Sequence, residues 1–205
     1  MYYAGIFCDD EKKECRAVVI EKVLRNARRE YHVAEIRDIS FDHVAQEAKT
    51  LYEDPAFLRK KKVFSQDRRP PKNTFTPPQV IFWAKSGRDD LVQAVRDQTV
   101  PVDGFFLRDD PGWDREEPKI LRFGANLHVG RDRLDKMASV LSSPSMVWAE
   151  AASPETSELR DEVSRCLNDK NHKGCYPSDM SPAMRALICA VWHCETIRPI
   201  KRYGG

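Results

Sequence analysis

A strand, a helix and a second strand follow one another in the middle of the chain, and this order constrains the fold more than any other feature. The strands are predicted at Gln79–Trp83 and Val102–Leu107, with a helix at Arg88–Gln98 between them. Neighbouring strands joined by a helix run parallel, and the helix covers one face of the sheet. Part of the chain is therefore predicted to form a parallel sheet covered by helices.

Three further strands and a helix precede this unit. The strands are predicted at Tyr2–Cys8, Cys15–Leu24 and Tyr31–Asp38, and the helix at Phe41–Tyr52. Three strands in a row with short connections are typical of an antiparallel meander. Together the two halves predict an α/β fold with one mixed sheet, antiparallel at the front and parallel at the back, flanked by helices.

The C-terminal part of the chain, 150–205, is predicted to be helical. In both Ser153-Pro154 and Ser181-Pro182, a serine that can cap a helix precedes a proline suited to its first turn. Before this part, a helix is predicted at Arg131–Leu141 and a short strand at Met146–Ala149.

The composition indicates one globular domain spanning 1–205. Of the 205 residues, 41% are hydrophobic and 32% are charged, which excludes a disordered chain. The formal net charge of +2 provides no global attraction to nucleic acid or membrane, so any such partner must meet a local patch. No apolar run is long enough to span a bilayer, and we expect a cytoplasmic protein with no membrane partner.

A local basic patch is present at 58–78, where prolines predict a long loop rather than a helix. This segment is either an ordinary solvated surface or a phosphate-contacting loop with Phe64 or Phe75 as a stacking surface. In the second interpretation, the nucleic-acid-binding residues are Arg59, Lys60, Lys61, Lys62, Arg68, Arg69 and Lys72.

The six cysteines form no C-x-x-C pair, and the default expectation is that they are buried thiols in a reducing compartment. A zinc site remains an alternative, because five residues near the C-terminus have suitable side chains. They are Cys166, His172, Cys175, Cys189 and His193.

The order of predicted elements resembles the RNase H-like fold, and the tail resembles the nuclease domain of phage DNA-packaging terminase large subunits. In the tail, Arg131–Val147 and Glu155–Arg165 are followed by the segment Ser178-Asp179-Met180-Ser181-Pro182-Ala183-Met184-Arg185. The resemblance implies DNA as partner, in a phage-packaging or mobile-element setting. It also implies acidic residues on the first strand, the fourth strand and the last helix that hold two divalent metal ions.

The chain departs from this acidic pattern at each place. Phe7 stands where an aspartate is expected on the first strand, and the fourth strand ends Phe82-Trp83-Ala84-Lys85 without an acid. In the tail Asp179 is kept, whereas Ser178 and Pro182 replace acids. Asp9, Asp10 and Asp179 are the candidate catalytic residues that remain, with Asp103 as a further carboxylate. A solvated turn would equally explain Asp9 and Asp10, and helix-start electrostatics would explain Asp179.

These departures favour a catalytically degenerate RNase H-like domain that acts by binding nucleic acid or as a structural partner. No metal site and no cofactor are expected in that case. One alternative is an active DNA endonuclease with displaced acids that requires Mg²⁺ or Mn²⁺. Another is a zinc-stapled protein-interaction module. The chain has no phosphate-binding glycine loop of the Gly-x-x-x-x-Gly-Lys type, so it contains no motor ATPase.

Overall fold

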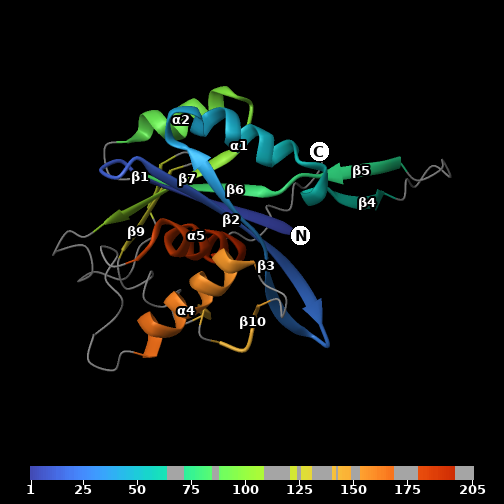
Figure 1. Ribbon diagram of the computed structural model, residues 1–205. Coiled ribbons are helices and arrows are strands. Elements are labelled where there is room, and N and C mark those ends of the chain that lie inside the picture. Colours follow the sequence, from blue (N-terminus) through green and yellow to red (C-terminus); the bar gives the residue numbers. More distant parts are fainter. Residues whose placement is uncertain are drawn as a thin grey trace.

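The computed structural model describes residues 1–63, 72–84, 88–108, 121–123, 126–130, 140–141, 143–148, 153–168 and 180–196. In these ranges eight strands form one sheet in the order β10-β3-β2-β1-β6-β7-β9-β8, and β4 and β5 form a separate hairpin. Helices cover both faces of the sheet (Figure 1).

The antiparallel half consists of β1 (Tyr2–Asp9), β2 (Glu14–Arg25) and β3 (Arg28–Ser40). Strand β1 pairs with β2 from Tyr2↔Glu21 to Asp9↔Glu14, and β2 pairs with β3 along its whole length. The register shifts between Val19 and Ile20, where β2 and β3 depart from regular pairing. All three strands lie where the sequence predicts them, and each extends further by one to three residues at its ends.

The parallel half begins at β1, which pairs in parallel with β6 (Gln79–Trp83). Strand β6 pairs in parallel with β7 (Val102–Arg108), and β7 with β9 (Asn126–Gly130). The short β8 (Leu121–Phe123) closes this edge by antiparallel pairing with β9. This mixed sheet, an antiparallel meander joined to parallel strands and flanked by helices, confirms the predicted RNase H-like layout.

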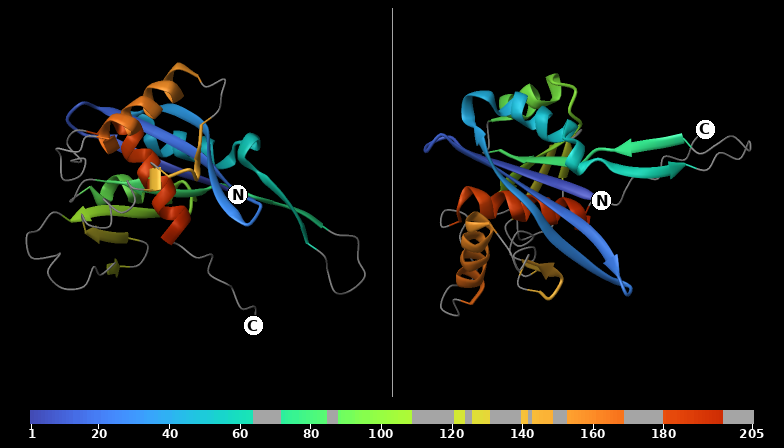
Figure 2. Two further views of the ribbon diagram at one scale, coloured as in Figure 1. Left: turned by 90° about the horizontal axis from the view of Figure 1, so that it is seen from below. Right: turned by 45° about the vertical axis from the view of Figure 1, so that its right-hand side comes forward.

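Helices of the described part of the chain cover both faces, and the sheet divides the core into two clusters (Figures 1 and 2). On one face lie α1 (Val44–Glu53) and α2 (Asp89–Asp97), which pack on the side chains of β1 that include Ala4 and Ile6. On the other face lie α4 (Pro154–Asn168) and α5 (Pro182–Thr196). No helix in the described part of the chain is long and apolar enough to cross a membrane.

The two expected serine caps of these last helices are both present. The Ser153 Oγ accepts a hydrogen bond from the backbone N–H of Thr156, and the Ser181 Oγ accepts one from Met184. The predicted helix at Phe41–Tyr52 instead begins with a 3₁₀ turn, η1 (Phe41–His43), before α1. The preceding strand thus turns sharply into the helix.

The segment 58–78 differs from its predicted form, since part of it is regular. A 3₁₀ turn, η2 (Pro55–Phe57), leads into β4 (Arg59–Val63), which pairs antiparallel with β5 (Lys72–Thr76). The hairpin projects beyond the end of the sheet (Figure 2). Arg68 and Arg69, which are predicted to bind nucleic acid, lie outside the described residues.

Two further predicted elements, a strand and a helix, are observed over only part of their predicted ranges. The predicted strand at Met146–Ala149 is β10 (Met146–Val147), which pairs in parallel with β3. The predicted helix Arg131–Leu141 lies outside the described residues except for its last two positions, which are helical.

The expectation that every cysteine is a free thiol is wrong for two of them. Cys8 and Cys15 stand directly opposite each other on β1 and β2 and form a disulfide. The connection between these strands is short, so the register brings the two sulfur atoms together. Among the described cysteines, Cys166, Cys189 and Cys194 are free.

Candidate functional site

Helix α5 crosses β1 in direct contact with its backbone. A Cβ atom on Gly5 would lie 2.0 Å from the carbonyl oxygen of Ala186 and 2.8 Å from the backbone nitrogen of Ala190. Only glycine permits this approach. The start of α5 is thereby fixed over the carboxyl end of β1, where the resemblance implies an acidic metal site.

Aromatic side chains fill the space between α5 and this part of the sheet. Phe7 packs edge-to-face on Trp83, at 5.5 Å between ring centroids, and Trp83 packs on Phe105 at 5.1 Å. Phe105 in turn packs on Trp192 of α5 at 5.2 Å. All four rings are buried. They provide no oxygen or nitrogen ligand suited to a hard divalent cation.

The guanidinium of Arg185 lies over this aromatic layer. Its Cζ is 4.5 Å from the centroid of the Phe7 ring, a cation–π contact. The pKa of Arg185 is lowered by burial, although the nearby carboxylates of Asp9 and Glu162 act in the opposite direction. A fixed positive charge therefore stands close to the carboxyl end of β1, where it opposes the binding of a metal cation.

Asp9, a candidate catalytic residue, follows Phe7 on the same face of β1. Its side chain is 9% exposed, and its Oδ1 accepts hydrogen bonds from the backbone N–H groups of Glu11 and Lys12. These bonds close the turn between β1 and β2. In the structure Asp9 thus organises the turn and contributes negative charge beside Arg185.

Asp10, the second candidate, lies near a different arginine. It forms an ion pair with Arg88, which precedes α2, and Arg88 also binds both carboxylate oxygens of Asp90 at 2.9 and 3.0 Å. Asp9 and Asp10 are therefore each associated with a guanidinium rather than with each other. The third candidate, Asp179, lies outside the described residues.

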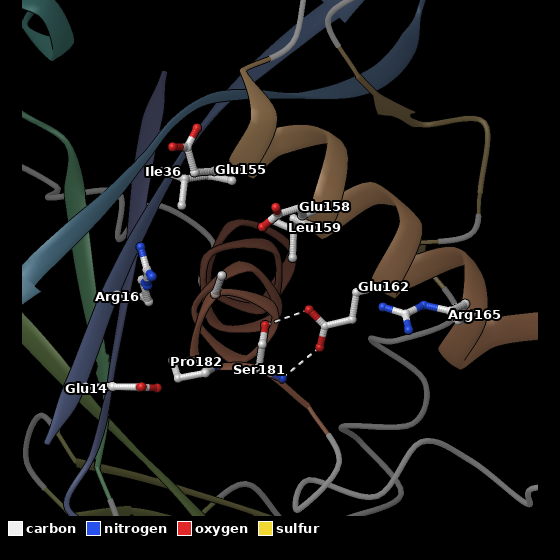
Figure 3. A pocket seen from close by; sticks show the side chains of 11 residues that line it. Glu14, Arg16, Ile36, Glu155, Glu158, Leu159, Glu162, Arg165, Ser181 and Pro182 are labelled. Carbon is white, nitrogen blue, oxygen red and sulfur yellow. Dashed lines mark hydrogen bonds between the residues drawn. The ribbon is translucent and has the colours of Figure 1, made fainter. Parts of the chain in front are cut away.

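A pocket opens beside the start of α5, between that helix, α4 and the antiparallel strands (Figure 3). Its volume is about 410 Å³. The lining combines carboxylates and guanidinium groups with a few apolar side chains. Its residues are Glu14, Arg16 and Ile36 from the sheet; Glu155, Glu158, Leu159, Glu162 and Arg165 from α4; and Ser181, Pro182 and Ala183.

Glu162 fixes the wall of this pocket by joining the two helices. Its two carboxylate oxygens accept hydrogen bonds from the backbone N–H and the hydroxyl of Ser181, at 2.7 and 2.6 Å (Figure 3). The Ser181 hydroxyl thus donates to Glu162 while it accepts from Met184. This hydroxyl is engaged in capping α5, and among the described lining residues none is a histidine.

The charges at the opposite wall are also paired. Arg16 forms an ion pair with Asp38 of β3. The pKa of Glu155 is lowered, first by a hydrogen bond with Ser153 and further by the charge of Arg16. Within the described residues, no group of three or more His, Cys, Asp or Glu side chains is arranged to hold a metal ion.

No family model, curated protein or solved structure matches the chain.

In the zinc alternative, His172 and Cys175 lie outside the described residues, whereas Cys166, Cys189 and His193 lie within them. Cys189 is fully buried in the core, and burial raises the pKa of its thiol. His193 instead forms a pair with Asp103 of β7, at 3.4 Å. The imidazole is only 4% exposed, so this pair serves packing between α5 and the sheet.

The β4–β5 hairpin is the described part of the predicted nucleic-acid interface. Arg59 pairs across the hairpin with Thr76 and Lys60 with Phe75, and Lys61 and Lys62 follow along the same strand. Arg59 is exposed, and Phe75 is 60% exposed. Lys72, which is also predicted to bind nucleic acid, is the first residue of β5. The fold therefore places a basic run and an exposed aromatic ring on one projecting element.

Two arginines that pair with the candidate acids, Arg88 and Arg185, were not predicted from the sequence. Local sequence does not single out either arginine, because each partner is distant in the chain. Arg88 lies 78 positions from Asp10, and Arg185 lies further still from Asp9. One signal is available for Arg185: it ends the tail segment that carries the terminase resemblance, next to a serine cap. Glu162 and Arg16 carry no comparable signal.

Proposed function

We propose that this protein binds nucleic acid through the β4–β5 hairpin and uses an RNase H-like scaffold that has lost its nuclease centre. The observation that carries the proposal is the hairpin itself, which projects from the sheet with four consecutive basic residues on β4. The phosphate backbone of nucleic acid attracts such a run through release of its counterions. Because the net charge of the whole chain is only +2, attraction to nucleic acid depends on a local run of positive charge such as this one.

The packing under α5 supports binding without cleavage. Two-metal catalysis requires several carboxylates around two cations a few ångströms apart. At the corresponding place this chain has the rings of Phe7 and Trp83 and the guanidinium of Arg185. Neither a ring nor a guanidinium can replace a carboxylate as a ligand. In this proposal DNA is the natural partner, and the protein acts in a phage-packaging or mobile-element setting, as the terminase resemblance implies.

The binding experiment compares the parent chain with a variant in which Arg59, Lys60, Lys61 and Lys62 are changed to glutamine. The dissociation constant for fluorescent DNA is measured by anisotropy over a range of salt concentrations. We expect weaker binding at low salt and a salt slope reduced by about 1 for each phosphate that is no longer neutralised. The matched control changes four basic residues away from the hairpin, Lys12, Arg28, Lys49 and Arg160, and should retain most of the affinity. Equal losses of affinity in both variants would contradict a hairpin site.

The same samples test for cleavage when they are incubated with supercoiled plasmid and Mn²⁺ or Mg²⁺. We expect no nicking. Nicking that disappears in Asp9→Asn or Asp179→Ala would overturn this part of the proposal and establish the active two-metal endonuclease in its place.

A further inference from the structure

Phe75 is an aromatic side chain exposed to water on a ribbon whose other residues, apart from Val63, are polar. Among the described residues, the large hydrophobic side chains that are exposed are Phe75, at 60%, and Leu24, at 72%. Leu24 lies near the turn between β2 and β3, whereas Phe75 lies beside the basic run. An exposed ring next to cationic residues is the arrangement with which proteins bind bases and phosphates together.

The hairpin register places Phe75 among the basic positions. Phe75 stands directly opposite Lys60, and the next pair along the ribbon towards the sheet is Arg59 with Thr76. In the other direction, Lys61 pairs with Thr74 and Lys62 with Asn73. A strand advances about 3.3 Å per residue, so the four basic positions extend over roughly 10 Å. This length corresponds to one or two nucleotide steps in all around a base seated at Phe75.

The base of the hairpin is anchored on the sheet by the residues that flank it. Phe57, just before β4, is 5% exposed and packs edge-on against Tyr2 of β1, at 5.4 Å between centroids. The side chain of Asp54 accepts a hydrogen bond from Ala56 and forms an ion pair with Arg37 of β3. Beyond β5, Pro78 is buried next to β6. Both ends of the hairpin therefore adjoin residues that are packed on the sheet or paired with it.

We infer that the hairpin binds single-stranded nucleic acid, with Phe75 stacking on an unpaired base and the basic positions of β4 neutralising the flanking phosphates. This inference rests on the proposed function and names the form of nucleic acid that the hairpin selects. A phenyl ring has no hydrogen-bonding group, so it recognises a base only through its face. In a duplex both faces of each base are already stacked, and the ring would have to separate two base pairs. In a single strand a base face is available without that cost.

The test uses a 5′-fluorescein-labelled 15-residue oligothymidylate and a blunt duplex of 15 base pairs, with affinities measured by anisotropy at one low salt concentration. For Phe75→Ala we expect affinity for the single strand to fall about tenfold and affinity for the duplex to change less than twofold. Phe75→Trp, which keeps a stacking surface, should retain single-strand binding. Leu24→Ala removes the other exposed apolar side chain and should change neither affinity.

The outcomes separate this inference from the proposed function. If Phe75→Ala leaves single-strand binding unchanged, or weakens both ligands equally, the stacking inference is overturned while binding through the basic run stands. A parent chain that prefers the duplex likewise overturns it. If the parent chain binds neither ligand at low salt, the proposed function fails and the inference fails with it. Because Phe75 is exposed, both variants should keep the parent melting temperature, which is checked by circular dichroism.

Discussion

At the scale of single residues, the position of α5 depends on Gly5. The helix backbone occupies the space that any side chain at position 5 would require. The neighbouring layer of Phe7, Trp83 and Arg185 depends on the same placement, because it fills the space between this helix and the sheet. A glycine in the middle of a buried strand is otherwise unfavourable, since it adds no packing and loses much conformational entropy.

Gly5→Ala should destabilise the protein strongly. The new Cβ would meet backbone atoms that can move only if α5 moves as a whole, and we expect a loss of at least about 3 kcal/mol in the free energy of unfolding. Urea denaturation followed by circular dichroism measures this loss. The matched control is Gly104→Ala, whose Cβ would meet the side chains of Asn126 and Phe106, which can adjust. An equal cost at both positions would contradict the special role of Gly5.

At the scale of elements, the last turn of α5 is bound to the antiparallel strands by Glu195. Its carboxylate accepts hydrogen bonds from Tyr31, from Lys22 at 3.3 Å and from Arg29 at 3.1 Å. Lys22 also donates to the carbonyl of Cys194, which caps the helix end. Partial burial acts to raise the pKa of Glu195, but the Tyr31 hydrogen bond and the charges of Lys22 and Arg29 outweigh it and lower the pKa.

This lowered pKa predicts a pH dependence of stability. The unfolded chain takes up a proton near pH 4.5, before the folded chain does, so the contribution of Glu195 is present above this pH and is lost as the pH falls through the lowered folded value. Glu195→Gln should therefore reduce the fall in melting temperature between about pH 5 and pH 3. Glu53→Gln, a change at an exposed carboxylate at the end of α1, is the matched control. A parent-like acid profile in the Glu195 variant would contradict the prediction.

The disulfide joins the first two strands at the end that carries Asp9. Replacing both Cys8 and Cys15 by alanine should lower the free energy of unfolding by about 2 kcal/mol, because the unfolded chain gains freedom when the link is absent. Reducing agent should lower the melting temperature of the parent and leave that of the double variant unchanged. If reducing agent changed the melting temperatures of the parent and the double variant equally, the isolated protein would not contain the disulfide.

The strands and helices that the sequence predicts well are those with several apolar residues at a regular spacing. Strand β6 is predicted to the residue, and β7 to within one residue. Strand β9 is not predicted, because its five residues include the polar Asn126 and His128. The prolines at 70, 71, 77 and 78 indicate a loop, yet they lie outside β4 and β5 and interrupt neither strand.

At the scale of the whole molecule, the mixed sheet separates two sets of side chains with different tasks. The face under α1 and α2 is an ordinary apolar core that includes the disulfide. The face under α5 carries aromatic rings, Arg185 and the charged pocket at the start of the helix. Local sequence could indicate that acids are missing from this second face. It could not indicate which groups stand there instead, because contacts such as that of Arg185 with Phe7 join distant parts of the chain.

The division between the eight-stranded sheet and the hairpin has a consequence for how such a protein can change over time. Within the described residues, β4 and β5 pair only with each other, so the central sheet does not depend on what the ribbon is made of. Substitutions there can accumulate with little effect on folding. A lineage could exchange this ribbon for one of different length or charge, and so acquire a new ligand, while inheriting the same interior.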